Sequence, residues 1–255
     1  MSEVACACVD LSLAGRAFTS RVHVFSHHST PCTPRCRHAR LPHPLRRRTR
    51  STGLIMKQAG LFDAGGTRIL LDDVSGKITL TPDLIDAQTA AQWFRALHDG
   101  IVWKSGRRVM YEREVDVPRL RAHFRTDDPA LPDVLQQALG RVRAAFGAPF
   151  DSIGLNLYRD QHDSVAPHND KLADIIRGQP IVLLSLGATR TMTIRGKQPP
   201  RHVLRVDLDA GSALLMSWET QLHYDHAILK QRAPIGPRIS LAFRVREAGK
   251  TGDVS

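Results

Sequence analysis

Residues 156–170, which read NLYRDQHDSVAPHND, hold the pattern that decides the fold, because an alternating strand is followed there by a His-x-Asp pair. His168 and Asp170 are two residues apart, and side chains two apart on an extended chain point to the same face. One imidazole and one carboxylate can therefore reach the same metal ion. A single His-x-Asp pair occurs often by chance, so its meaning depends on what the rest of the chain supplies.

A second stretch, residues 221–226 (QLHYDH), offers two candidates for a third ligand, His223 and His226. Two histidines and one carboxylate around a metal with open positions form the facial triad of non-haem Fe(II) oxygenases. A lone histidine near a strand is more often a structural hydrogen-bonding residue, but its combination with the His-x-Asp pair favours a ligand. Composition alone does not separate His223 from His226.

A third stretch, residues 238–245 (RISLAFRV), alternates in polarity, and Arg238 and Arg244 fall on the same face of the predicted strand. If that face points inward, both guanidinium groups need anions, and a planar guanidinium pairs bidentately with a carboxylate. If it points outward, the two arginines are solvated surface. The inward alternative suits a metal site that also binds a dicarboxylate co-substrate.

The chain has 255 residues, 42% hydrophobic and 24% charged, which suits one globular domain of about 200 residues with an extension. No stretch approaches the roughly 18 apolar residues that span a bilayer, so we expect no membrane partner. The net charge of +11 favours a polyanionic partner. Residues 1–55 hold nine arginines and two acidic residues, a net +7, so the remainder carries +4.

Residues 1–55 are rich in Arg, His, Pro, Ser and Thr and lack a periodic apolar pattern, which predicts a disordered basic extension. Three interpretations remain: a nucleic-acid-binding tail, a transit peptide, or a translated upstream region with the true start at Met56. We favour the last, because organised sequence begins directly after Met56. All four cysteines lie in the first 36 residues, so the domain at residues 56–255 fits a reducing, cytoplasmic compartment.

Two amphipathic helices are predicted before the strand-rich part of the chain. The first begins near residues 81–83 (TPD), has apolar side chains at helical spacing over residues 90–97, and stops at Gly100. The second has apolar side chains from Leu135 to Phe146 and ends at Gly147.

Strands are predicted at residues 101–104 and 107–115, joined at Ser105-Gly106. From Ile153 onward the chain reads as short strands separated by Gly or Pro turns. Together these elements predict an α+β, mainly β fold, a double-sheet jelly roll buttressed by the two N-terminal helices.

The segment from about Pro118 to Arg246 resembles the AlkB family of Fe(II)- and 2-oxoglutarate-dependent dioxygenases. The matching pieces follow the family's order, with similar gaps, over roughly half of the chain. They are residues 117–120 (VPRL), 156–158 (NLY), Asp163, 168–170 (HND), 185–187 (SLG), 211–216 (GSALLM), His226, 237–238 (PR) and 243–244 (FR).

The resemblance implies a double-stranded β-helix, with a nucleotide-recognition lid at about residues 100–127 and a jelly-roll core at about residues 150–246. It implies three iron ligands, His168, Asp170 and His226. His226 is preferred over His223 because it lies where the family's distal histidine precedes the first arginine, twelve positions before Arg238. It also implies four 2-oxoglutarate contacts: Asn156, Tyr158, Arg238 on the distal carboxylate, and Arg244 near the iron.

The activity implied by the resemblance is oxidative dealkylation of N-alkylated bases in nucleic acid, of the 1-methyladenine and 3-methylcytosine type. It would consume 2-oxoglutarate and O₂ and release formaldehyde and succinate. The target base must leave the stack, so we expect a flipped base or a single strand of DNA or RNA, bound by a monomer. The alternatives are the same chemistry on RNA or on a protein side chain, and a non-catalytic basic nucleic-acid-binding jelly roll.

Contacts to the base are the least defined part of the resemblance. Repair members of the family often carry an acidic residue two positions after the iron aspartate, whereas this chain has Leu172, so Asp174 is the candidate replacement. Trp103 and Tyr111 are candidates for stacking on the base, and Arg119 for a phosphate. For Trp103 the alternative is an ordinary core residue.

Overall fold

The computed structural model describes residues 66–110 and 113–247, and of residues 107–110 and 113–116 it describes the backbone alone. These residues all belong to Lys57–Ser255, the second of two compact units into which the chain divides. The expectations for residues 1–55 and for Tyr111 lie outside the described residues. Within them, no helix is both long enough and apolar enough to cross a bilayer.

Strands make up most of the described chain. They are β1 (Arg68–Asp73), β2 (Gly76–Thr81), β3 (Lys104–Met110), β4 (Arg113–Arg125), β5 (Ser152–Tyr158), β6 (Val165–His168), β7 (Ile181–Gly187), β8 (Arg190–Gly196), β9 (Val203–Leu208), β10 (Ala213–Met216), β11 (Tyr224–Ile228) and β12 (Arg238–Arg244). The helices are α1 (Ala87–Gly100), α2 (Asp133–Phe146), the single-turn α3 (Thr220–His223) and a 3₁₀ turn, η1 (Leu172–Asp174).

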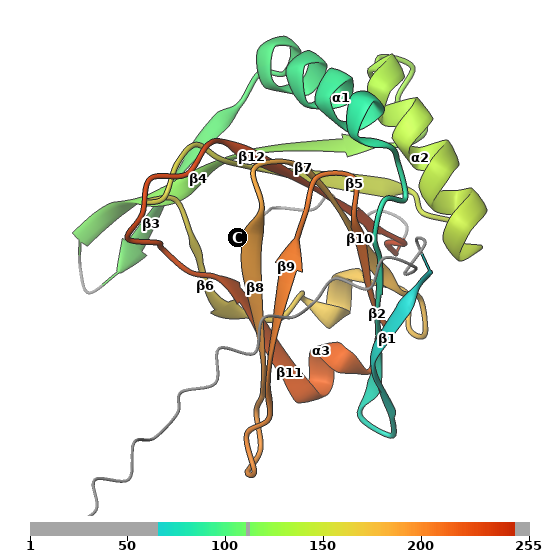
Figure 1. Ribbon diagram of the computed structural model, residues 1–255, viewed down its shortest axis with the longest axis vertical. Coiled ribbons are helices and arrows are strands. Elements are labelled where there is room, and N and C mark those ends of the chain that lie inside the picture. The colour runs from blue at the N-terminus through green and yellow to red at the C-terminus, as the bar shows by residue number, and fades with distance from the viewer. Residues whose placement is uncertain (1–65, 111–112, 248–255) are drawn as a thin grey trace, which may run out of the picture. The chain divides into compact units, whose positions relative to one another are not determined.

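The strands form two antiparallel sheets, and the predicted jelly roll is confirmed. The larger sheet has the order β1-β2-β10-β7-β12-β5-β4-β3, and the smaller one has the order β6-β11-β8-β9. Figure 1 shows α1 and α2 against the outer face of the larger sheet, over β12, β7 and β5, with the smaller sheet on its opposite side. The helices therefore close one face of the larger sheet, and the other face is left to the interior of the jelly roll.

The alternation of β12 divides its side chains between these two faces. Ile239, Leu241 and Phe243 are fully buried in the cluster that includes the two helices. Ala242, between them, packs in a second cluster with Met192 of the smaller sheet. Burying a side chain such as Phe243 contributes about 1.5–3 kcal/mol, so the apolar face fixes the register and forces the arginine face inward. The inward alternative is thereby confirmed.

The two predicted helices are present, but the first begins later than expected. The side chain of Asp86 accepts a hydrogen bond from the Thr89 backbone N–H at 2.8 Å, so Asp86 is the N-cap and α1 begins at Ala87. The expected start at residues 81–83 is wrong, because residues 82–86 form a turn after β2. The second helix ends at Gly147, as predicted, and this glycine adopts the left-handed conformation.

The turn predicted at Ser105-Gly106 is also wrong, because β3 runs through both residues. A register shift between Ser105 and Arg107 places Gly106 at a bulge in the pairing of β3 with β4. A Cβ atom at Gly106 would lie 2.5 Å from a guanidinium nitrogen of Arg121, so the glycine allows close approach and does not mark a chain reversal.

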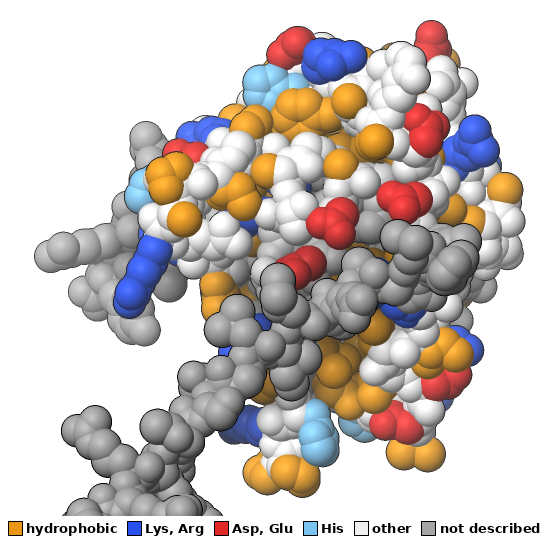
Figure 2. All heavy atoms as spheres, in the orientation of Figure 1, with side chains coloured by type: hydrophobic (Ala, Val, Ile, Leu, Met, Phe, Trp, Pro, Cys, Tyr) orange, Lys and Arg blue, Asp and Glu red, His pale blue; other side chains and the backbone are white. Residues whose placement is uncertain are grey.

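On the face drawn in Figure 2, basic, acidic and apolar side chains of the described residues are interspersed. Charge on this face does not mark a binding surface by itself, so the candidate site has to be built from particular residues.

Candidate metal and co-substrate site

The three predicted metal ligands lie together at the junction of β6 and β11. His168 and His226 are cross-strand partners, and their ring centroids are 4.4 Å apart. Asp170 follows two residues after His168. One ligand atom from each of the three residues lies within 4.8 Å of the other two, which fits a single metal ion. His223 is the last residue of α3 and is not part of this group.

The protonation of His226 suits metal binding. Burial lowers its pKa, the neighbouring His168 lowers it further, and the opposing effect of Asp170 leaves it at about 4. At neutral pH the imidazole is therefore uncharged. A neutral imidazole has the free lone pair that a metal ion requires.

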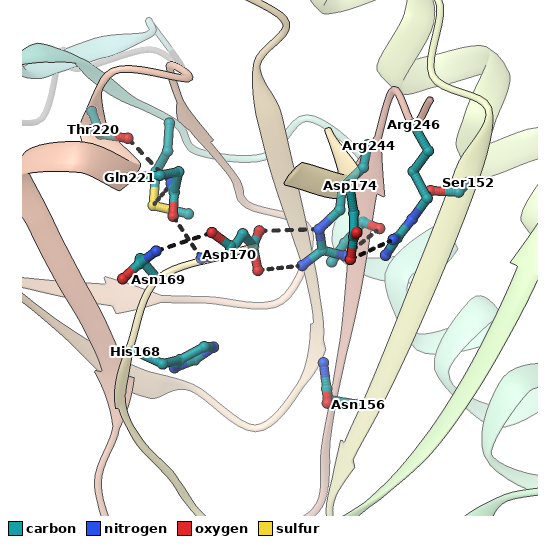
Figure 3. Close-up of polar contacts among 12 residues, drawn as sticks. Ser152, Asn156, His168, Asn169, Asp170, Asp174, Thr220, Gln221, Arg244 and Arg246 are labelled. Carbon is teal, nitrogen blue, oxygen red and sulfur yellow. Dashed lines mark hydrogen bonds and ion pairs between the residues drawn. The ribbon is translucent and has the colours of Figure 1, made fainter. Parts of the chain in front are cut away.

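The carboxylate of Asp170 is held in its charged form by Arg244. Nε and Nη2 of Arg244 donate to the two carboxylate oxygens at 3.0 and 2.9 Å (Figure 3). Burial raises the pKa of Asp170, but Arg244, through its charge and its hydrogen bonds, and the neighbouring His226 and His168 outweigh this effect and lower the pKa to about 2. Gly154 leaves room for this arginine, because a Cβ atom there would lie 3.1 Å from its Nη1.

The four predicted co-substrate residues line the same pocket as the two histidines. They come from paired strands, since Tyr158 of β5 is opposite Arg238 of β12 and Asn156 is opposite Ser240. The lining includes Asn156, Tyr158, His168, His226, Arg238 and Arg244. The pocket therefore extends from the metal ligands His168 and His226 to Arg238, which can bind an anion.

Arg238 supplies the observation that tests whether 2-oxoglutarate fits. Its side chain is 1% exposed, and its Nε donates to the Ser185 hydroxyl at 2.9 Å. Its Nη2 is buried and has no hydrogen-bond partner among the described residues. A buried cation with an unpaired donor is costly unless an anion completes it, so a carboxylate fits here.

Asn156 and Arg119 are linked at the other side of the pocket. Nε of Arg119 donates to Oδ1 of Asn156 at 2.8 Å, which leaves the amide nitrogen of Asn156 as the group that can donate to a co-substrate. Arg119, proposed from the sequence as a phosphate contact, is instead almost buried and lies along the pocket wall.

The predicted substrate residues are not all brought together. A second pocket, called the mouth, shares Arg119, Asn156, His168 and Arg244 with the co-substrate pocket and also contains Asp170. Asp174 lines the mouth, and its carboxylate lies 3.9 Å from Nη1 of Arg246. Lys171 lines the same mouth. Trp103 lies away from it, because its Nε1 donates to the carbonyl of His98 at the end of α1 and its ring packs against the helix core.

Sequence reasoning missed a buried arginine that supports the pocket. Arg190, at the start of β8, is fully buried and donates to the backbone carbonyls of Asp160, Asp163 and Leu229. Its guanidinium carbon also lies 5.5 Å from the ring centroid of Tyr158. An arginine at a strand end is usually exposed, so the local pattern gave no signal for it.

Comparisons with known proteins agree with this geometry. A family model described as the 2OG-Fe(II) oxygenase superfamily matches residues 77–244. The chain is 29% identical over 187 residues to the alpha-ketoglutarate-dependent dioxygenase alkB homolog 3 of Homo sapiens. The aligned region covers 66% of this chain and 65% of that protein. It is 33% identical over 123 residues to the DNA oxidative demethylase ALKBH2 of Bos taurus, and that aligned region covers 46% of this chain and 44% of that protein.

The chain therefore spans less than two thirds of the length of these curated relatives. Among solved structures, the fold is similar to a prolyl hydroxylase from Trichoplax adhaerens, in complex with a hypoxia inducible factor oxygen degradation domain peptide fragment. The TM-score is 0.50 at 12% identity, covering 67% of this chain and 84% of that one. This likeness concerns the fold alone.

Proposed function

This chain belongs to the 2OG-Fe(II) oxygenase superfamily as an AlkB-like dioxygenase, and we propose that it oxidatively dealkylates N-alkylated bases in nucleic acid. Its cofactors are Fe(II), 2-oxoglutarate and O₂. The observation that carries the proposal is the position of the mouth. His168 lines both the co-substrate pocket and the mouth, and Asp170 lines the mouth, so an alkyl group entering there meets the metal site directly.

When bound, Fe(II) and 2-oxoglutarate would activate O₂, with one oxygen atom hydroxylating an alkyl carbon and the other entering succinate as the co-substrate loses CO₂. The protein's residues position the reactants. Arg238 pairs with the distal carboxylate of 2-oxoglutarate through its buried unpaired nitrogen. Arg244 holds Asp170 ionised and oriented through the two guanidinium nitrogens that donate to its carboxylate. A hydroxylated N-methyl group then releases formaldehyde and leaves the unmodified base.

The mouth suits a base that has left the stack. Asp174 places a carboxylate there and Lys171 a cation, so exocyclic N–H donors and a backbone phosphate both have partners. A flipped base or a single strand is required, because the target atom is inaccessible within a duplex.

The test is succinate formation by the full chain with and without substrate. We expect single-stranded DNA carrying 1-methyladenine or 3-methylcytosine to increase succinate formation over the same oligonucleotide without the methyl group. Matched RNA oligonucleotides and methylated peptides assign the alternative substrates, and His168→Ala supplies the background. Equal rates with methylated and unmethylated nucleic acid would overturn the proposal.

A further inference from the structure

The three metal ligands are held by two different kinds of structure. His168 and His226 are cross-strand partners, so the backbone ladder between β6 and β11 fixes their separation. Asp170 lies beyond the last residue of β6, where this ladder has ended. The position of the carboxylate ligand therefore depends on contacts other than strand pairing.

Arg244 contacts the carboxylate oxygens, one of which a metal ion would also bind, but the backbone of Asp170 has a separate anchor. The Asp170 N–H donates to Oε1 of Gln221 at 3.0 Å (Figure 3). Gln221 is 1% exposed and belongs to α3, which leads directly into β11 and His226. This one hydrogen bond therefore joins the segment that carries the carboxylate to the segment that carries the distal histidine.

Lys197 joins the same two segments a second time. It follows β8, the strand that pairs with β11. Its Nζ donates to the side-chain oxygen of Asn169 at 3.1 Å and to the backbone carbonyl of Gln221 at 2.8 Å. The side chain of Lys197 is 28% exposed, so this contact is less shielded from water than the buried amide of Gln221.

The fold alone does not account for an amide at position 221. Its nitrogen finds the Met216 sulfur at 4.0 Å and the Thr220 hydroxyl at 3.3 Å, which are weak partners for a buried donor. Burying an amide is costly unless its hydrogen bonds compensate, and a leucine of similar size would avoid that cost. The strong interaction of the Gln221 side chain is the one to Asp170.

We propose that Gln221 is a positioning residue for the metal site. It fixes the backbone of Asp170 against the His226 segment, and Lys197 supports the same connection. The proposal rests on the iron site of the family and not on the nucleic-acid substrate proposed above, so the two can fail separately. Gln221 acts through Asp170, since it is buried and lines neither the co-substrate pocket nor the mouth.

The experiment is a calorimetric titration of the metal-free full chain with Co(II) alone. Gln221→Leu removes the acceptor at similar volume, and we expect Co(II) affinity to fall about 10–100-fold, the usual effect of losing a partner that orients a ligand. We expect Gln221→Glu, which keeps an oxygen acceptor, to retain affinity within about tenfold of the wild type and to keep its Co(II) absorption spectrum. Gln136→Leu, on α2, removes a glutamine that bonds a backbone carbonyl far from the site and should bind as the wild type does.

Two results would overturn the proposal. One is wild-type Co(II) affinity in Gln221→Leu. The other is a loss in Gln221→Glu as large as in Gln221→Leu, with an altered spectrum, because the acceptor oxygen would then not be what matters.

Lys197→Met keeps the proposal testable if Gln221→Leu does not fold. We expect a loss of Co(II) affinity in the same direction but smaller. If both variants fold, the double variant should lose less than the product of the two single losses, since both act on one connection. Unchanged affinity in Lys197→Met, with Gln221→Leu unfolded, would count against the positioning role.

Discussion

At the scale of single residues, the site is built from buried charged groups, and not all of them have a hydrogen-bond partner within the described chain. Arg244 is satisfied by Asp170, whereas Arg238 keeps one buried nitrogen without a partner among the described residues. Arg244 therefore orients the metal ligand Asp170, and Arg238 has a free donor for an incoming anion. The alternation of the strand places both arginines on one face without distinguishing their roles, which only the resemblance to the family separated.

Arg238→Ala should weaken 2-oxoglutarate binding by at least about a hundredfold, because removing one member of a buried charge pair costs about 3–5 kcal/mol. The measurement is a titration of the Mn(II)-loaded protein with 2-oxoglutarate. Arg205→Ala, at an exposed position of β9, is the matched control and should bind normally. Unchanged affinity in Arg238→Ala would exclude this arginine from the co-substrate site.

The pKa of His226 predicts how the metal-free protein responds to acid. Its folded pKa is about 4 against an ordinary value of 6.5, so between these values the unfolded chain binds a proton that the folded chain does not. The contribution of His226 to the free energy of unfolding is therefore fully present above pH 6.5. It is lost as the pH falls toward 4, and the loss is on the order of 3 kcal/mol.

Thermal melting of the metal-free protein between pH 7 and pH 4 measures this loss. His226→Gln should show a shallower decline than the wild type across that range. Parallel curves for the two proteins would mean that the buried imidazole does not carry the effect.

At the scale of elements, the alternation of β5 and β12 could be predicted because it arises from one strongly apolar face. Other features could not. The bulge at Gly106 resembles a turn in sequence, and the helical turn α3 is too short to show a period. The buried amide of Gln221 carries no local signal either, because its partner lies fifty-one residues earlier in the chain.

The boundary between α3 and β11 separates His223 from His226, the two candidates for the third metal ligand that composition could not distinguish. His226→Ala should abolish turnover that depends on iron, while His223→Ala should keep most of it, because His223 ends the helix outside the ligand group. Succinate production by both variants measures this. Loss at His223 with retention at His226 would show that the ligand assignment is wrong.

Trp103 lies where α1 ends and the β3–β4 hairpin begins, and its contacts favour the core interpretation. We expect Trp103→Ala to lower the melting temperature and to reduce succinate formation with and without methylated oligonucleotide. Loss of the oligonucleotide-stimulated part alone, at an unchanged melting temperature, would return Trp103 to the base-stacking role.

At the scale of the whole molecule, the sequence predicts that residues 1–55 are dispensable for the chemistry, and the family match begins only at residue 77. Deleting residues 1–55 should leave folding and basal succinate formation intact. If this segment binds nucleic acid, the truncated protein should bind more weakly and with a shallower salt dependence, because fewer counterions are released. A truncated chain that cannot fold would contradict the predicted boundary.

The most direct measurement of the central claim is the mass of a methylated single-stranded oligonucleotide after incubation with the full chain, Fe(II), 2-oxoglutarate and O₂. The account predicts the loss of one methyl group as formaldehyde, with an equal amount of succinate, and no change with His226→Ala. Steady conversion of 2-oxoglutarate to succinate, while methylated DNA and RNA keep their mass, would contradict it.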